Sequence, residues 1–345
     1  NIIEDRAYDV LGALASWKTN LVILYPGVAA TQHAMRVLTD KGHRTFLVGM
    51  QKFHEDDKVK ISAVGTKVRI TNLSETASLE LISLWDASLF GVELCGGKAE
   101  RLSRLKVTGF QVPHGSVLTT RIFDETVKLI SGKTLLELEQ FKQNYKSLNK
   151  LPRALKEKIT KLFSDYIASQ KQYAVRSSGT IEDTAKVSMA GMFESVIGAS
   201  KKEIVPAVLK VIQSTFAPKI VSYFKGKPDL VPQLKMAVVV QEIVKAKAAG
   251  VIFGAQVQTR NLDIVEIEAK KGLGEGIVAG TTRKIARFQF SRSEKRMIKR
   301  EGKEILSLGE AKALFVLSER LRSEFNDVPQ DIEWTIDKNR QIWVL

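Results

Sequence analysis

The chain has 345 residues, 44% of them hydrophobic, and a formal net charge of +15 from 53 Lys and Arg against 38 Asp and Glu. This length favours two or three domains with sizeable cores, and the positive charge suits a polyanionic ligand such as a nucleotide, a nucleic acid or a phosphorylated substrate. The single cysteine excludes a disulfide framework within the chain, and no apolar run reaches the ~18 residues of a membrane span, so we expect a cytoplasmic protein outside the membrane.

Residues 1–75 are predicted to form a small α/β unit, preceded by an upstream segment because the chain begins at Asn1 rather than Met. Apolar runs at 21–26 and 44–49 are typical of strands, and residues 29–42 between them are predicted to form a helix that ends at Gly42. Residues 57–71 alternate as in a β-hairpin. We expect residues 76–93 to be a linker that includes a helix.

Residues 94–345 are predicted to form the second domain. A glycine pair leads into a short helix, a loop and a strand over 94–120, and apolar residues at helical spacing predict helices over 121–170. Strands dominate from Tyr173 onward, at 173–175, 235–244, 249–256, 262–269 and 283–291. A helix at 308–325 and a hairpin at 330–345 complete the domain, and the basic stretch 291–304 is expected to be a solvated helix or hairpin face.

The stretch "YAVRSSGTIED" (Tyr173–Asp183) carries one arginine at the end of a strand-like run, followed by small hydroxyl residues and two acids. Arginine offers a planar fork of donors that suits phosphate oxygens, and small residues let backbone N–H groups approach an anion closely. We therefore expect Arg176 and the residues after it to form part of a phosphate site.

Two further pieces complete a nucleotide site. Lys98, which we expect on a strand beside the glycine pair, can neutralise a triphosphate together with Arg176. Asp331 and Glu333 are spaced by two, so a strand would place both carboxylates on one face, where they can bind Mg²⁺ while substrate phosphates complete its ligand shell.

In this order the motifs resemble the nucleotide-binding domain of the phosphoenolpyruvate synthase / pyruvate phosphate dikinase family, which has the ATP-grasp fold. The resemblance runs from Leu94 to Leu345 and rests on five segments: "CGGKAERLSRLKVTGFQVPHGSVLTT", "AVRSSGTIEDTAKVSMAGMFES", "MAVVVQEIVKAKAAGVIFG", "EIEAKKGLGEGIVAG" and "QDIEWTID". It differs after the third segment, where this chain has "GAQVQTR" in place of the family's Thr-x-x-Pro turn.

The resemblance implies ATP and Mg²⁺ as cofactors and gives each motif a role. Lys98 and Arg176 would bind ATP phosphates, and Asp331 and Glu333 would hold the metal. The phosphate-covering loop would be formed by Ala190, Gly191 and Met192. The residues along the adenine and ribose would be Gln241, Glu242 and Ile243, with Glu268 near the ribose and phosphates.

The segment "TQHA" (Thr31–Ala34) lies where a predicted strand leads into a helix, and it resembles the Thr-x-His-Ala signature of the family's swivelling phosphohistidine domain. The resemblance implies that His33 is a catalytic phosphoacceptor, since a neutral imidazole is a good nucleophile and a helix N-terminus stabilises a phosphoryl group. A single Gly27 replaces the usual double glycine, and Thr39 stands where an arginine is expected. A generic βαβ unit with an exposed His33 is the alternative.

The predicted fold class is α/β and α+β: a small swivelling β/α domain followed by a two-lobed ATP-grasp domain. The predicted function is ATP-dependent, dikinase-type phosphotransfer from ATP to a histidine and then to an unidentified acceptor, bound elsewhere in a longer chain or by a partner, with AMP as a product. A non-catalytic nucleotide-binding regulatory domain is the second reading. A polyanion-binding or nucleic-acid-binding protein is the third, although no zinc-finger spacing or basic heptad supports it.

Overall fold

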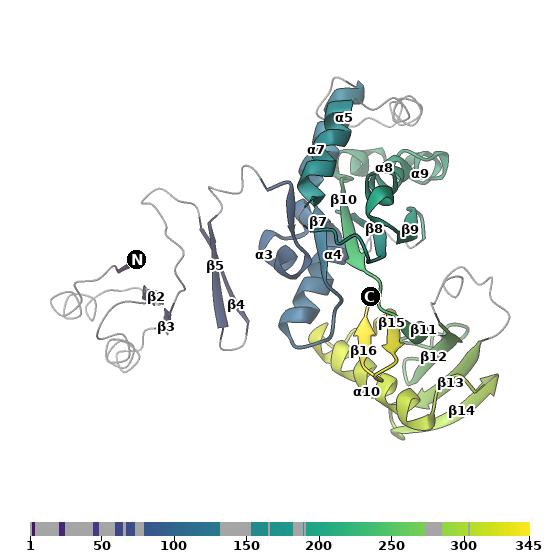
Figure 1. Ribbon diagram of the computed structural model, residues 1–345. Helices are drawn as coiled ribbons and strands as arrows, with labels where there is room; N and C mark the ends of the chain where they lie inside the picture. Colours follow the sequence, from purple (N-terminus) through teal and green to yellow (C-terminus); the bar gives the residue numbers. More distant parts are fainter. Residues whose placement is uncertain are drawn as a thin grey trace. The chain divides into compact units, whose positions relative to one another are not determined.

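The computed structural model describes residues 2–3, 21–24, 44–47, 59–64, 67–72, 79–131, 153–164, 166–181, 189, 191–272, 285–302 and 304–345 (Figure 1). The described residues form both helices and sheets. The chain divides into two compact units, Asn1–Leu79 and Glu80–Leu345.

The first unit contains two small sheets among its described residues. A parallel three-stranded sheet has the order β1–β2–β3, and β4 and β5 form an antiparallel hairpin. The strands are β1 (Ile2–Ile3), β2 (Leu21–Leu24), β3 (Arg44–Leu47), β4 (Val59–Val64) and β5 (Lys67–Asn72). Both predicted strands and the predicted hairpin are present, whereas the predicted helix at 29–42, with His33, lies outside the described residues.

The second unit begins with an antiparallel five-stranded sheet of order β6–β7–β10–β8–β9. Its strands are β6 (Leu81–Ser83), β7 (Gly115–Leu118), β8 (Tyr173–Gly179), β9 (Ser195–Ala199) and β10 (Met236–Glu242). Strand β6, the 3₁₀ turn Leu84–Asp86 and α3 (Ala87–Phe90) occupy much of the stretch 76–93 that we expected to be a linker. Residues 80–93 are therefore part of the second unit, because β6 pairs with β7.

Helices cover both faces of this sheet. One face packs against α5 (Thr120–Ser131), α7 (Arg153–Phe163), α8 (Ile204–Ser214) and α9 (Pro218–Phe224), and the other packs against α4 (Val92–Val107). Alternation along β10 explains the division: Val238 and Val240 join the core with the four helices, so Val239 and Gln241 face α4. Helix α7 and all but the first residue of α5 lie within the stretch 121–170 predicted to be helical.

Helices α8 and α9 were missed, although "AVLKVIQSTF" places apolar residues at helical spacing. The segment Lys201–Phe224 that contains them is long and apolar enough, by length and composition, to cross a membrane. Its apolar residues, including Val208, Val211 and Ile220, are buried in the core of the five-stranded sheet. The segment is therefore a core element of this unit.

The second sheet has six antiparallel strands in the order β14–β13–β12–β11–β15–β16. They are β11 (Ala246–Phe253), β12 (Ile264–Lys271), β13 (Ala286–Ser291), β14 (Arg296–Gly302), β15 (Ile332–Asp337) and β16 (Ile342–Val344), and they include the predicted C-terminal hairpin. The basic stretch 291–304 supplies the exposed strand β14, as expected of a solvated hairpin face, with Arg292 as an exception described below.

One face of the six-stranded sheet is apolar and the other is polar. Along β12, Val265, Ile267 and Ala269 are fully buried and alternate with Glu266 and Glu268. The apolar face packs against α10 (Leu308–Glu324), where the rings of Phe290 and Phe315 stack with centroids 4.9 Å apart. Because residues two apart share a face, the polar face is left to the carboxylates.

The start of α10 gives folding stability a predictable pH dependence. Glu310 closes a capping box with Ser307, and the Nζ of Lys247 on β11 donates to its carboxylate at 2.5 Å. Burial would raise the pKa of Glu310, but the hydrogen bonds from Lys247 and Ser307 and the Lys247 charge outweigh it and hold the pKa below its ordinary value.

A carboxylate whose pKa is lowered by folding stabilises the folded state above its ordinary pKa, here about 4.5, and this stabilisation is lost as the pH falls through the folded-state value. We therefore expect wild type to exceed Glu310→Gln in stability at pH 7 by a margin that shrinks below about pH 4.5. Urea unfolding of both proteins between pH 7 and pH 3 measures the margin. A margin that stays constant or grows toward low pH would contradict this account.

Candidate nucleotide-binding site

We expected Lys98 on a strand, but it lies in the first turn of a helix. Helix α4 is interrupted at Gly96, where φ is 72° and ψ is 166°, and a new helical segment starts immediately after it. A Cβ at position 96 would lie 1.9 Å from the carbonyl oxygen of Ser178, so this turn requires glycine. The half-buried Lys98 thus sits at a helix N-terminus, where the helix dipole adds to its attraction for phosphate.

Ser178 holds this turn against the five-stranded sheet. Its hydroxyl donates to the carbonyl of Cys95 at 2.8 Å and accepts from the backbone N–H of Ala99 at 3.0 Å. The two bonds bracket Gly96, which fixes the start of the helix relative to β8. Ser178 was not singled out from the sequence, and its position two residues after Arg176 on the same face was the available signal.

The first small residues after Arg176, which we expected to let backbone N–H groups approach a phosphate, have their backbone in β8. Ser177, Ser178 and Gly179 continue β8 and pair with Val238, Ala237 and Met236 of β10. Their backbone is part of the sheet, and the Ser178 hydroxyl is committed to α4. Among the described residues of this segment, the Arg176 side chain is therefore the candidate for a phosphate site.

Arg176 and Glu333 form an ion pair between the two sheets of the second unit. The Arg176 side chain on β8 is 10% exposed, the Glu333 side chain on β15 is 38% exposed, and Nη1 of the arginine donates to Oε2 of the glutamate at 2.8 Å. One donor of the five-donor guanidinium is used in this bond. Two residues 157 positions apart in the sequence are thereby brought into contact.

Lys98 acts on the same carboxylate. Desolvation would raise the pKa of Glu333, but the charges of Arg176 and Lys98 and the hydrogen bond from Arg176 outweigh it and hold the pKa below its ordinary value. Glu333 therefore stays ionised at neutral pH. The structure brings Lys98, Arg176 and Glu333, taken from three separate sequence motifs, into one electrostatic cluster.

Gln241 faces this cluster's side of the five-stranded sheet. It is buried at the end of β10 opposite Ala174, and its Nε2 has no hydrogen-bond partner among the described residues. A buried amide donor without a partner costs free energy unless a ligand satisfies it. Gln241 is therefore the strongest candidate among the three residues predicted to lie along the adenine.

The two residues after Gln241 have their backbone donors occupied. The N–H of Glu242 donates to the carbonyl of His114 at 2.8 Å, and the N–H of Ile243 donates to the carbonyl of Gln172 at 3.0 Å. The Glu242 carboxylate pairs with Lys171 at 2.6 Å. An adenine ring beside this segment would therefore find carbonyl and side-chain groups rather than free backbone N–H groups.

Glu268 and Glu333 lie in one row across the polar face of the six-stranded sheet. Both residues are opposite Val251 of β11, one on each side, which places them two strand spacings or about 10 Å apart. Glu268 is neutralised by Arg287 of β13, whose Nε donates to its Oε1 at 2.7 Å. The predicted ribose-side and metal-side carboxylates thus share a face without contacting each other.

Asp331 immediately precedes β15 and is two residues from Glu333. It is exposed, and its Oδ1 accepts from the backbone N–H of Gly254 at 3.3 Å. Within the described part of the chain no cluster of three or more His, Cys, Asp or Glu could hold a metal alone. Two carboxylate groups fit Mg²⁺, which is commonly bound by one or two carboxylates together with substrate phosphates.

The predicted phosphate-covering loop is described only in part. Ala190 lies outside the described residues, Gly191 is an exposed turn residue with φ of 69°, and the Met192 N–H donates to the carbonyl of Met189 at 3.0 Å. The side chain of Met192 packs against the core of the five-stranded sheet. Nothing in these contacts joins Gly191 or Met192 to the cluster of Lys98, Arg176 and Glu333.

Known proteins are similar in sequence to parts of this chain. A probable phosphoenolpyruvate synthase of Methanocaldococcus jannaschii is 27% identical over 295 residues, which cover 72% of this chain and 25% of that protein. The corresponding protein of Methanothermobacter thermautotrophicus is 30% identical over 292 residues, covering 71% of this chain and 42% of that one. A rifampicin phosphotransferase of Bacillus subtilis is 29% identical over 206 residues, which cover 55% of this chain and 24% of that protein. The chain therefore spans between a quarter and about two fifths of these relatives.

Among solved structures, the ATP-grasp ligase PsnB complexed with its minimal precursor aligns with 95% of this chain and 90% of that one, at 10% identity and a TM-score of 0.29. So low a score carries no weight for the fold. The family model described as the pyruvate phosphate dikinase AMP/ATP-binding domain matches residues 92–345, nearly three quarters of the chain, and confirms the resemblance seen in the motifs. The chain belongs to the family of the pyruvate phosphate dikinase AMP/ATP-binding domain.

Proposed function

We propose that the second unit binds ATP in the manner of an ATP-grasp domain and that the chain is a nucleotide-dependent phosphotransferase module. The observation that carries the proposal is the ion pair of Arg176 and Glu333, whose carboxylate also feels the charge of Lys98; the three residues come from three distant motifs. Membership of an AMP/ATP-binding family supports a nucleotide as the ligand.

In this proposal the two cations bind the phosphates of ATP. Arg176 is held in place by Glu333 and keeps further donors on its planar fork, so it can bind phosphate oxygens without losing that partner. Lys98 adds a second charge from a helix N-terminus fixed by Gly96 and Ser178. Preorganised cations of this kind stabilise the charge that develops during phosphoryl transfer.

Asp331 and Glu333 would hold Mg²⁺ on the polar face of the six-stranded sheet. When bound, the metal would neutralise phosphate charge. Gln241 would satisfy its buried amide donor on the base or sugar of the nucleotide, and Glu268 would lie farther along the same sheet face, near the ribose. Gly191 and Met192 would belong to a segment that covers the phosphates.

The proposed acceptor within the chain is His33 in a swivelling domain formed by residues 1–75. Its imidazole nitrogen would attack the β-phosphorus of ATP, the bond to the α-phosphate would break, and AMP would leave. The imidazole would then carry a pyrophosphoryl group, water would take its γ-phosphoryl group as inorganic phosphate, and the remaining β-phosphoryl group would pass to a second acceptor outside the described residues. Relatives named phosphoenolpyruvate synthase and rifampicin phosphotransferase support the reaction class and leave the identity of that acceptor open. We place this reaction in the cytoplasm.

The reaction is tested by incubating the full chain with Mg-ATP labelled at the β-phosphate. The proposal predicts AMP and labelled protein in equal amounts in the absence of any second acceptor. ATP that binds and stays intact would contradict phosphotransfer and would favour a non-catalytic nucleotide-binding regulatory domain.

A further inference from the structure

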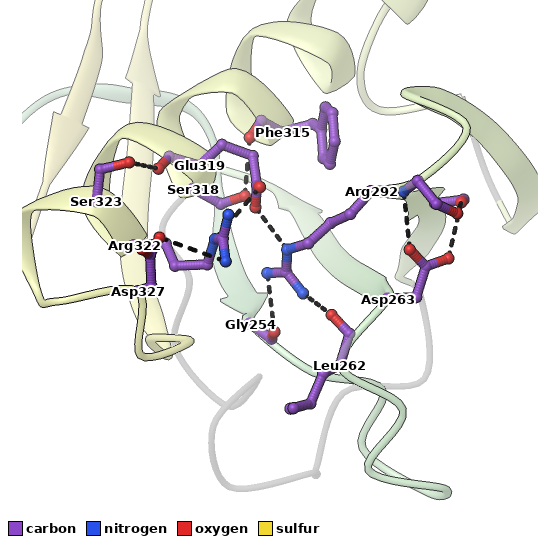
Figure 2. Close-up of polar contacts among 12 residues, drawn as sticks. Gly254, Leu262, Asp263, Arg292, Phe315, Ser318, Glu319, Arg322, Ser323 and Asp327 are labelled. Atoms are coloured by element: carbon purple, nitrogen blue, oxygen red, sulfur yellow. Dashed lines mark hydrogen bonds and ion pairs between the residues drawn. The ribbon is translucent and has the colours of Figure 1, made fainter.

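A second arginine, Arg292, lies in the basic stretch 291–304 that resembled a solvated face, yet its side chain is only 12% exposed. Figure 2 shows it extending from the turn between β13 and β14 toward three acceptors on three different segments. Its Nε donates to Glu319 of α10 at 2.7 Å, its Nη2 donates to the carbonyl of Gly254 at 2.9 Å, and its Nη1 donates to the carbonyl of Leu262.

The two carbonyls lie at the ends of the loop that joins β11 to β12, which is the segment where this chain departs from its family's usual turn. Arg292 therefore closes this loop at both ends. A second contact reinforces the closure, because Asp263 at the end of the loop accepts from the hydroxyl of Ser291 and from the N–H of Ser293, both at 2.8 Å. These bonds hold the pKa of Asp263 below its ordinary value, so its charge persists at neutral pH.

Gly254 connects this network to the proposed metal side. Its carbonyl accepts from Arg292, while its N–H donates to Oδ1 of Asp331 at 3.3 Å. Its Cα packs against the backbone just before Asp331. A Cβ at this position would lie 2.5 Å from the N atom of Gln330 and 2.9 Å from the carbonyl carbon of Pro329. A displacement of Gly254 would therefore move Asp331 with it.

We propose that Arg292 is a positioning residue that sets the Asp331 carboxylate for Mg²⁺ through Gly254. The proposal rests on the nucleotide site proposed above and extends it beyond the residues that would touch ligand or metal. Partners behind a metal ligand orient it, and their loss typically lowers metal affinity by 10-fold to 100-fold.

Arginine suits this position because one planar group reaches a carboxylate and two carbonyls at once. Lysine has a single nitrogen on a flexible stem and would not hold all three segments. The ion pair with Glu319 offsets the free-energy cost of removing the charged guanidinium from water, because a buried charge is stable only when it is paired. Glu319 also pairs with Arg322 at 3.4 Å, which ties the network along α10 (Figure 2).

The test is the equilibrium affinity of the full chain for ATP, measured in EDTA and at saturating Mg²⁺. We expect Arg292→Ala to weaken ATP binding in Mg²⁺ by about 10-fold and to leave binding in EDTA unchanged. The matched control is Arg296→Ala, which removes the same charge from an exposed position on β14 beside Glu294 and should change neither affinity.

A double-mutant cycle separates positioning of Asp331 from a general effect on the fold. Asp331→Asn should reduce the gain in affinity that Mg²⁺ provides, and Arg292→Ala should add no further loss in that background. The proposal would be overturned if Arg292→Ala lowered the Mg²⁺-dependent gain in ATP affinity equally in the wild-type and Asp331→Asn backgrounds. It would also be overturned if a folded Arg292→Ala protein kept the wild-type gain. If Arg292→Ala does not fold, Arg292→Lys decides: a reduced gain supports the proposal and an unchanged gain overturns it.

The outcome for wild type distinguishes this proposal from the one on which it rests. Wild-type protein that binds no ATP under either condition contradicts the nucleotide site itself. Wild-type protein that binds ATP with a clear Mg²⁺ gain, while the Arg292 variants keep that gain, contradicts only the role of Arg292.

Discussion

Arg176→Ala is expected to remove most of the thermal stabilisation that Mg-ATP gives to the wild-type chain. A ligand at 100 times its Kd stabilises a folded protein by about 2.7 kcal/mol, which for a chain of this size corresponds to a rise in Tm of about 5 °C. Arg176 would contribute the only fork-shaped donor group in the proposed cluster of Lys98, Arg176 and Glu333, and charge-assisted bonds of this kind are the strong ones.

The comparison is made within each protein, with and without Mg-ATP, because the substitution also leaves the half-buried Glu333 without its partner. Arg153→Ala is the matched control, since the Arg153 side chain is 89% exposed on α7 and pairs only with Glu157 of the same helix in the described structure. The control should keep the full shift. A shift of wild-type size in Arg176→Ala would show that the phosphates bind elsewhere.

His33→Ala is expected to abolish phosphorylation of the protein while leaving ATP binding intact. A phosphoryl group on an imidazole nitrogen is labile in acid and stable in base, so ATP labelled at the β-phosphate should leave an acid-labile, base-stable label on the wild-type chain. In-line attack requires the nitrogen to come within about 3–3.5 Å of the phosphorus, so only a histidine that reaches this distance can be labelled.

His43→Ala is the control for this experiment, because it removes another imidazole of the first unit outside the "TQHA" motif. It should keep the label. A label that survives in His33→Ala would assign the phosphoryl group to another residue. No label on wild-type protein, under conditions where ATP binds, would leave nucleotide binding without phosphotransfer as the function of this chain.

The sequence predicted most strands of the second unit because an antiparallel sheet with one buried face alternates apolar and polar residues, as β12 and β15 do around Glu268 and Glu333. The order of the motifs predicted Lys98, Arg176 and Glu333 as site residues. Local patterns could not predict that Arg176 contacts Glu333, because a contact between residues so distant in sequence depends on the tertiary fold. Helices α8 and α9 were predictable from their apolar spacing and were missed.

Local sequence patterns could not predict the residues that support the site, such as Ser178 and Arg292. Ser178 acts on a turn whose bonded residues lie 79 and 83 positions earlier in the chain, and the Gly96 that it brackets shows only as one of a pair of glycines. Arg292 sits among exposed charges of both signs, and its low exposure depends on Gly254, Leu262 and Glu319, which come from other segments. Local periodicity carries no information on such contacts, because they form only when distant elements pack together.

A calorimetric titration of ATP with Mg²⁺ tests most directly whether Lys98, Arg176 and Glu333 bind ATP. We predict one ATP per wild-type chain, an affinity at least about 10-fold weaker in Lys98→Ala, and wild-type affinity in Lys128→Ala, which removes an exposed lysine of α5. The absence of saturable binding to wild type, or equal affinity in wild type and Lys98→Ala, would contradict the claim.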